Sequence, residues 1–148
     1  MNMENAKTIL LVEDEAIIAV SEKRTLNRHG YKVIWVSSGE QAVDTFTNST
    51  EIDLILMDIN LGAGMDGTQA AEMILKHREV PLIFLSSNTE REVVEKTEDI
   101  TCYGYIVKHL GAIELIVSIK IAFLLFDARM KARMGLIEWA GPRLVAQF

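Results

Sequence analysis

The chain has 148 residues, enough for one domain with a buried core, and one cysteine, Cys102, so an internal disulfide is excluded. Its net charge of −6 argues against nucleic-acid binding, since phosphate-binding surfaces are usually basic. The first seven residues are polar, and the apolar stretch Ile113 to Phe126 is interrupted by Glu114 and Lys120. We therefore expect a cytoplasmic protein that neither binds nucleic acid nor inserts into a membrane.

Five short apolar runs are predicted to be strands. Each is rich in aliphatic, β-branched or aromatic residues over only four to six positions, which is typical of strands buried on both faces. The runs are Thr8 to Val12, Lys32 to Val36, Ile52 to Met57, Leu82 to Leu85 and Tyr103 to Val107.

Helical patterns follow each of these runs. The predicted helices cover about residues 16–28, a segment opened by Ser38 with Gln41 in a capping-box pattern, 68–77, 89–100, and a stretch from Gly111 or Ala112 to at least Phe126. Strands that alternate with helices across short connections predict an α/β fold of (βα)5 type. We expect a five-stranded, parallel, doubly wound sheet in the flavodoxin-like order 2-1-3-4-5.

Polar residues stand at the ends of four predicted strands: Glu13 with Asp14, then Asp58, Ser86 and Lys108. In the predicted order these strand ends meet in one crevice. Three neighbouring carboxylates repel one another unless a cation binds, and hard oxygen ligands suit Mg²⁺. A lysine and a hydroxyl opposite the metal would complete a cage for a phosphoryl group, and an aspartate can accept that group.

The same segments resemble the receiver domain of two-component response regulators, of the chemotaxis-regulator type. The resemblance lies in four segments: Ile9 to Glu15, Leu56 to Leu61 continuing to Met65-Asp66-Gly67, Pro81 to Ser87, and Gly104 to Lys108. Each segment alone is a weak signal, but four in this order, each at a strand end, are a strong one. The resemblance covers roughly residues 7–126.

The resemblance implies a phosphoacceptor site rather than an enzyme active site. Asp58 would receive a phosphoryl group from the phosphohistidine of a histidine kinase. Glu13, Asp14 and Asp58 would hold Mg²⁺ together with the backbone carbonyl of Asn60. The domain would assist its own phosphorylation and dephosphorylation, and would change its affinity for a downstream protein or a phosphotransfer partner.

The resemblance also implies a switch. Ser86 would move to hydrogen-bond the phosphoryl group, Tyr105 would rotate inward, and Lys108 would pair first with the acids and then with the phosphate. Asn60 and Asn88, each two residues past a site residue, would tune the dephosphorylation rate by shaping the access of water.

One position departs from the family pattern. Receivers usually carry a proline after the lysine, joined by a cis peptide, whereas this chain has His109. A cis bond before a residue other than proline costs about 3–4 kcal/mol. We therefore predict a trans bond between Lys108 and His109 and a reshaped loop before the last helix.

The chain is predicted to divide into a receiver domain at 1–126 and a helical extension or tail at 127–148, with no separate output domain. The resemblance also suggests a homodimer through the fourth helix, fifth strand and fifth helix. One stripe of the last helix is expected to pack on the sheet, and it consists of Leu115, Ile116, Ile119, Ala122, Phe123 and Phe126. Val117, Ile121, Leu124 and Leu125 are left on other faces, which either a wide contact with the sheet or a partner surface would explain. Five residues also follow the alternating spacing of three and four that a coiled-coil seam shows. They are Ile116, Ile119, Phe123, Phe126 and Met130.

Two other functions remain open from the sequence. The first is a degenerate receiver that binds partners without being phosphorylated, which only the missing proline favours. The second is a small phosphatase of the haloacid dehalogenase type, which also uses an aspartate nucleophile and Mg²⁺. That family needs a second aspartate where this chain has Asn60, and its nucleophile normally follows the first strand.

Overall fold

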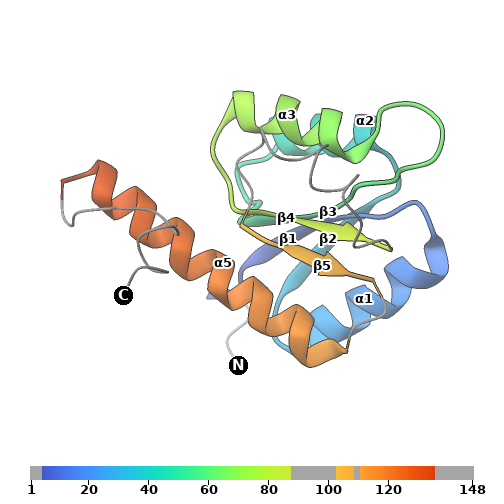
Figure 1. Cartoon of the computed structure of the whole chain (residues 1–148), viewed down its shortest axis with the longest axis horizontal. Coiled ribbons are helices and arrows are strands. Elements are labelled where there is room, and N and C mark those ends of the chain that lie inside the picture. The colour runs from blue at the N-terminus through green and yellow to red at the C-terminus, as the bar shows by residue number, and fades with distance from the viewer. Residues whose placement is uncertain (1–4, 88–102, 109–110, 136–148) are drawn as a thin grey trace.

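The computed structural model describes residues 5–87, 103–108 and 111–135 and contains one parallel sheet (Figure 1). Its strands lie in the order β2-β1-β3-β4-β5. They are β1 (Thr8–Val12), β2 (Lys32–Val36), β3 (Leu54–Asp58), β4 (Leu82–Ser86) and β5 (Tyr105–Val107). The predicted parallel α/β sheet is confirmed in the order 2-1-3-4, and the short β5 pairs with β4 over three residues.

Four helices cover the sheet in the described residues: α1 (Ala16–Arg28), α2 (Gly39–Thr47), α3 (Gly67–His77) and α5 (Ala112–Arg133). Figure 1 shows α2 and α3 on one face and α1 and α5 on the other. The helix predicted over 89–100 lies outside the described residues, so the complete (βα)5 pattern remains a prediction. No helix within the described ranges is both long and apolar enough to cross a membrane.

The central strands β1, β3 and β4 are buried along their whole length. Because successive side chains point to opposite faces, each strand contributes side chains to two hydrophobic cores, one on each face of the sheet. Leu10, Ile55 and Phe84 pack towards α2 and α3, whereas their neighbours Leu11 and Leu56 pack towards α1 and α5. This burial on both faces explains why these strands read as continuous apolar runs.

Four strand ends differ from the prediction by one or two residues, among them the start of β5, which lies at Tyr105 rather than Tyr103. The third strand begins at Leu54 rather than Ile52. Just before it, Asp53 N donates to Thr8 O at 2.8 Å and Asp53 Oδ2 accepts from Thr8 N at 2.8 Å, so a side-chain oxygen takes the place of a backbone acceptor there. The strands β3 and β4 include Asp58 and Ser86 as their last residues. Both polar side chains are therefore held by the sheet itself.

Side chains cap the N-termini of α2 and α3, whereas α1 and α5 begin without a side-chain cap. Ser38 accepts from Gln41 N at 3.1 Å, as predicted, but the Gln41 side chain accepts from Ser37 N, so the reciprocal half of the box is displaced by one residue. A complete capping box occurs instead at α3, between Asp66 and Gln69. This box sets the start of α3 directly after the loop that follows Asp58.

The helix α5 continues past residue 126 and ends at Arg133, followed by Gly135 with φ of 75°. The stripe predicted to pack on the sheet is confirmed by the burial of Leu115 and Ala122 together with Ile116 and Ile119, so these two isoleucines are not open to a coiled-coil partner. Ile116 and Ile119 are buried against the sheet, Phe123 stacks on Tyr31 at 6.3 Å between ring centroids, and Phe126 meets an aromatic ring of the loop before β5. The boundary between the domain and its extension remains a prediction.

Candidate functional site

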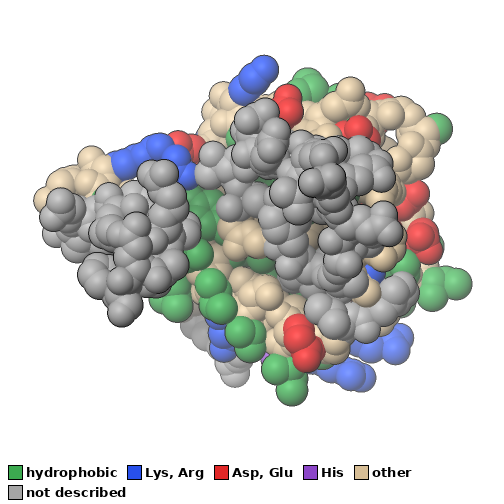
Figure 2. All heavy atoms as spheres, viewed as in Figure 1, with side chains coloured by type: hydrophobic (Ala, Val, Ile, Leu, Met, Phe, Trp, Pro, Cys, Tyr) green, Lys and Arg blue, Asp and Glu red, His purple; other side chains and the backbone are tan. Residues whose placement is uncertain are grey.

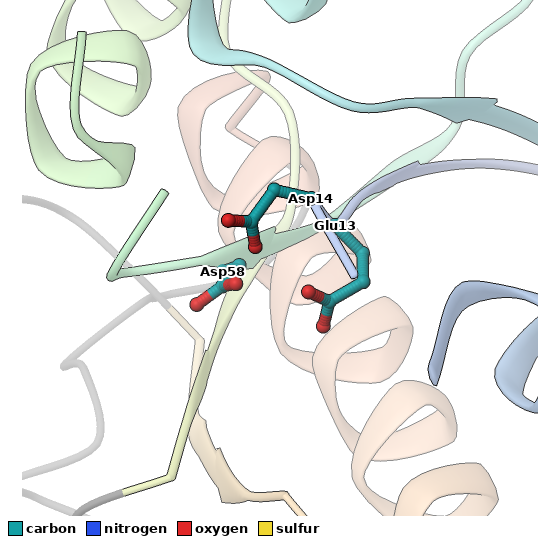
Figure 3. A group of neighbouring side chains, drawn as sticks. All are labelled: Glu13, Asp14 and Asp58. Atoms are coloured by element: carbon teal, nitrogen blue, oxygen red, sulfur yellow. The ribbon is translucent and has the colours of Figure 1, made fainter. Parts of the chain in front are cut away.

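Three carboxylates meet at the carboxyl ends of β1 and β3 (Figure 3). Glu13 and Asp14 follow β1, and Asp58 ends β3. One oxygen of each lies within 4.8 Å of the others. Glu13 and Asp58 are buried, with exposed fractions of 0% and 1%, whereas Asp14 is exposed. Among the three acids, it is Asp14 that connects the cluster to solvent.

Lys108 closes the other side of this cluster. Its backbone N–H donates to Ser86 O at 2.6 Å, which fixes the lysine beside the end of β4. Its Nζ lies 2.8 Å from Glu13 Oε1 and 2.8 Å from Asp58 Oδ2. The ammonium therefore bridges the two buried carboxylates, and the sequence-predicted acids and lysine are brought together.

The surroundings of the cluster disfavour the ionised form of Asp58. Burial raises the pKa of Asp58 to about 7, and the charge of Glu13 adds to this, although hydrogen bonding and attraction from Lys108 oppose it. Burial lowers the pKa of Lys108, but its hydrogen bonds to Asp58 and Glu13 outweigh burial and raise it. One ammonium does not compensate three carboxylates, so the site favours an additional cation.

The donor set fits Mg²⁺. All three side chains offer hard oxygen ligands, and one oxygen from each is close enough to share a single ion. The exposed Asp14 leaves room for the waters that Mg²⁺ usually keeps. No second group of three such ligands occurs among the residues that the structure describes.

The loop between β3 and α3 is tied to the site by backbone donors. Asn60 N donates to Asp58 Oδ1 at 3.0 Å, and Gly62 N donates to Asp14 Oδ2 at 3.1 Å. Gly67 N donates to the carbonyl of the residue after Asp58 at 3.0 Å. A side chain at Gly67 would overlap the backbone carbonyl of Asp58, so only glycine fits there.

The remaining predicted residues are placed as follows. The buried Ser86 ends β4, one residue past Leu85, which pairs in register with Asp58 on β3. Tyr105 begins β5 and pairs in register with Phe84. Asn88, His109 and the predicted trans bond between Lys108 and His109 lie outside the described residues.

Two site neighbours were missed by sequence reasoning. Trp35 on β2 donates its indole N–H to Glu13 O at 2.8 Å, and no sequence signal points to this contact. Glu22 lies between Ala19 and Leu26 on the buried stripe of α1. Burial raises the pKa of Glu22 to about 7, with the charge of Glu13 adding to the shift. The spacing of three and four on α1 is the signal by which this acid could have been found.

Comparison with known proteins agrees with this geometry. A family model described as a response regulator receiver domain matches residues 9–120. The transcriptional regulatory protein PdtaR of Mycobacterium tuberculosis is 30% identical over 117 residues, which cover 78% of this chain and 56% of that protein. The regulator YvrH of Bacillus subtilis is 31% identical, covering 80% and 49%. The chain spans about half the length of these curated relatives.

Solved structures show the same architecture. The N-terminal domain of a response regulator/sensory box/GGDEF protein from Carboxydothermus hydrogenoformans is 42% identical with a TM-score of 0.80, covering 84% of this chain and 99% of that one. The receiver domain of a sensor histidine kinase from Pseudomonas aeruginosa has a TM-score of 0.72 at 30% identity, covering 79% and 98%. That structure holds a magnesium ion in its active-site cleft. With a family match across most of its length, this chain belongs to the response regulator receiver domain family.

Proposed function

We propose that this chain is a phosphoacceptor signalling switch in which Asp58 receives a phosphoryl group from the phosphohistidine of a histidine kinase. The observation that carries the proposal is the Asp58 carboxylate, buried at the end of β3, with Lys108 Nζ at 2.8 Å and two further carboxylates within reach of a shared ion. Family membership supports the kind of donor.

In this reaction an Asp58 oxygen forms a bond to phosphorus while the phosphorus–nitrogen bond of the phosphohistidine breaks. The imidazole leaves with the bonding electron pair. Glu13, Asp14, Asp58 and the backbone carbonyl of Asn60 would hold Mg²⁺. When bound, this ion supplies positive charge against the phosphoryl oxygens as charge develops. Lys108 supplies the second positive charge from the opposite side.

The switch proposal concerns the changes that phosphorylation sets off in the domain. Ser86 hydrogen-bonds the new phosphoryl group, and Tyr105 turns inward in response. Lys108 exchanges its contact with Asp58 for one with the phosphoryl oxygens. The burial of Ser86 at the end of β4 and the bond from Lys108 N to Ser86 O support this coupling, because both residues lie at one strand end. Asn60 and Asn88 tune the lifetime of the phosphoryl group.

The output is a changed affinity for a downstream protein or a phosphotransfer partner, and a second copy of the chain is one proposed partner. Figure 2 shows hydrophobic side chains along the course of α5. Ile113 and Leu124 are 75% and 70% exposed, and Val117 and Ile121 lie between them on the same helix face. This face supports a homodimer formed through α5 with β5 and the preceding helix. A mass measurement in solution, with and without phosphorylation, tests it, and a monomer in both states would exclude it.

The phosphoacceptor proposal is tested by incubation with Mg²⁺ and a small phosphodonor, followed by intact mass measurement. The wild type should gain one phosphoryl group, and Asp58→Asn should gain none. A gain that persists in Asp58→Asn would show that the acceptor is another residue. No gain with several donors and several kinases would favour a receiver that acts only by binding.

A further inference from the structure

Two carboxylates that are not part of the loop between β3 and α3 accept hydrogen bonds from its backbone. One belongs to Asp14, whose Oδ2 accepts from Gly62 N at 3.1 Å. The other belongs to Glu40, which accepts from Met65 N at 3.3 Å through Oε1 and at 3.4 Å through Oε2. Glu40 lies in the first turn of α2 and is not a member of the acidic cluster.

We propose that Glu40 is a positioning residue that holds this loop, and with it the Asn60 carbonyl, when Asp14 engages a cation. This inference rests on the proposed function of the site. An Asp14 carboxylate that binds a cation must share its lone pairs between the ion and Gly62 N, so its hold on the loop weakens. Glu40 is not a ligand of the cation, so it accepts the hydrogen bond from Met65 N both with and without a cation on Asp14.

The backbone of the loop supports this assignment independently of the hydrogen bonds. Gly64 has φ of 94°, and a Cβ added there would lie 2.6 Å from Glu40 Oε2. The neighbouring Gly39 is also packed against the loop, since its Cβ would lie 3.0 Å from Met65 O. The loop is therefore shaped around the start of α2, and the Glu40 carboxylate occupies the space that Gly64 leaves open.

Glu40 also has a purely local explanation, because an acid in the first turn stabilises a helix through the helix dipole. Three variants separate the two roles. Glu40→Ala removes both the charge and the acceptor. Glu40→Gln removes the charge but keeps a carbonyl oxygen that can accept from Met65 N. Asp44→Ala is the matched control, since this α2 acid accepts from Asn48 on its own helix and no bond from it to the loop occurs among the described residues.

The experiment measures Mg²⁺ affinity by isothermal titration calorimetry and the exchange rate of the Met65 amide by NMR. For Glu40→Ala we expect about threefold weaker Mg²⁺ binding, because the lost bond is exposed and long, together with faster exchange at Met65. Glu40→Gln should recover most of both properties, and Asp44→Ala should match the wild type. A local helix role predicts instead that Glu40→Gln loses stability without any change in Mg²⁺ affinity.

Unchanged Mg²⁺ affinity in a folded Glu40→Ala would overturn the inference, as would an equal loss in Asp44→Ala. If Glu40→Ala does not fold, Glu40→Asp gives the second route, because it keeps an acid in the first turn of α2 but shortens the side chain that reaches Met65 N, and it should weaken Mg²⁺ binding likewise. Phosphorylation of each protein by a small donor is measured in parallel. A wild type that binds Mg²⁺ but never gains a phosphoryl group contradicts the proposed function and leaves the Glu40 result to be judged separately.

Discussion

Raising the pH in the absence of Mg²⁺ should destabilise the protein through Asp58. Burial raises the pKa of Asp58 in the folded protein from 3.8 to about 7. Between these two values the folded state binds a proton that the unfolded chain has already released. The free energy of unfolding must therefore fall as the pH rises through this interval. The stabilising contribution is fully present below the unfolded pKa and is lost above the folded one.

The size of the effect follows from the shift. One pKa unit corresponds to about 1.36 kcal/mol, so between pH 5 and pH 8 Asp58 should remove about 2–3 kcal/mol from the free energy of unfolding. Lys108 does not reverse the trend, because its raised pKa keeps it protonated throughout this range. A loss of this size is a large part of the stability of an ordinary domain.

The assay is urea unfolding at 25 °C in the presence of a chelator, at four pH values from 5 to 8, for the wild type and Asp58→Asn. The variant should show the shallower pH dependence, because asparagine does not titrate. Repulsion among the other charges affects both proteins and cancels in the comparison. Equal slopes in the two proteins would refute the assignment of a raised pKa to Asp58, as would a wild type that gains stability towards pH 8.

Four substitutions test other parts of the site. Glu22→Gln should also flatten the pH dependence of urea unfolding, because burial raises the pKa of Glu22 to about 7. Lys108→Met should lower the free energy of unfolding by about 3–5 kcal/mol at pH 8 in the presence of a chelator, because two buried carboxylates lose their partner. The melting temperature of this variant should rise again in part when Mg²⁺ is added. Gly67→Ala should abolish phosphorylation in the mass assay, because the new methyl group meets the Asp58 carbonyl. Trp35→Phe should lower the free energy of unfolding, measured in urea, by about 1 kcal/mol, because it removes the hydrogen bond from the indole N–H to Glu13 O.

The central strands and the acidic cluster are predictable from the sequence for one physical reason. Strands buried on both faces must be apolar throughout, so β1, β3 and β4 stand out, and the polar residues at their ends are conspicuous. Because the strands are parallel, their carboxyl ends all lie at one edge of the sheet. The flavodoxin-like order expected for alternating strands and helices then places Glu13, Asp58 and Lys108 in one crevice.

The stripe of α5 that packs on the sheet was also predictable, but a partner-facing seam on the same helix was not. Apolar residues occur on every side of this helix, so the spacing of the core stripe and that of a coiled-coil seam both fit the sequence. Ile116 and Ile119 are buried, whereas their neighbours Val117 and Ile121 are 48% exposed. Only the position of the helix on the sheet decides between them. The contact of Glu40 with Met65 is likewise tertiary, since it joins a helix and a loop 25 residues apart.

The bridge that Lys108 makes couples the charge of the site to the end of β4. Its ammonium and a bound cation both stabilise the same Asp58 carboxylate, so the apparent affinity for Mg²⁺ reflects competition for charge as well as coordination. With all three carboxylates ionised and Lys108 protonated, the cluster carries two net negative charges, which one Mg²⁺ neutralises.

A phosphoryl group added to Asp58 brings new negative oxygens, and Lys108 is the nearest cation of the chain in the described site. In the proposed switch, Lys108 would exchange its contact with Asp58 for one with the phosphoryl oxygens. Because Lys108 N donates to Ser86 O, that movement would be transmitted to the end of β4.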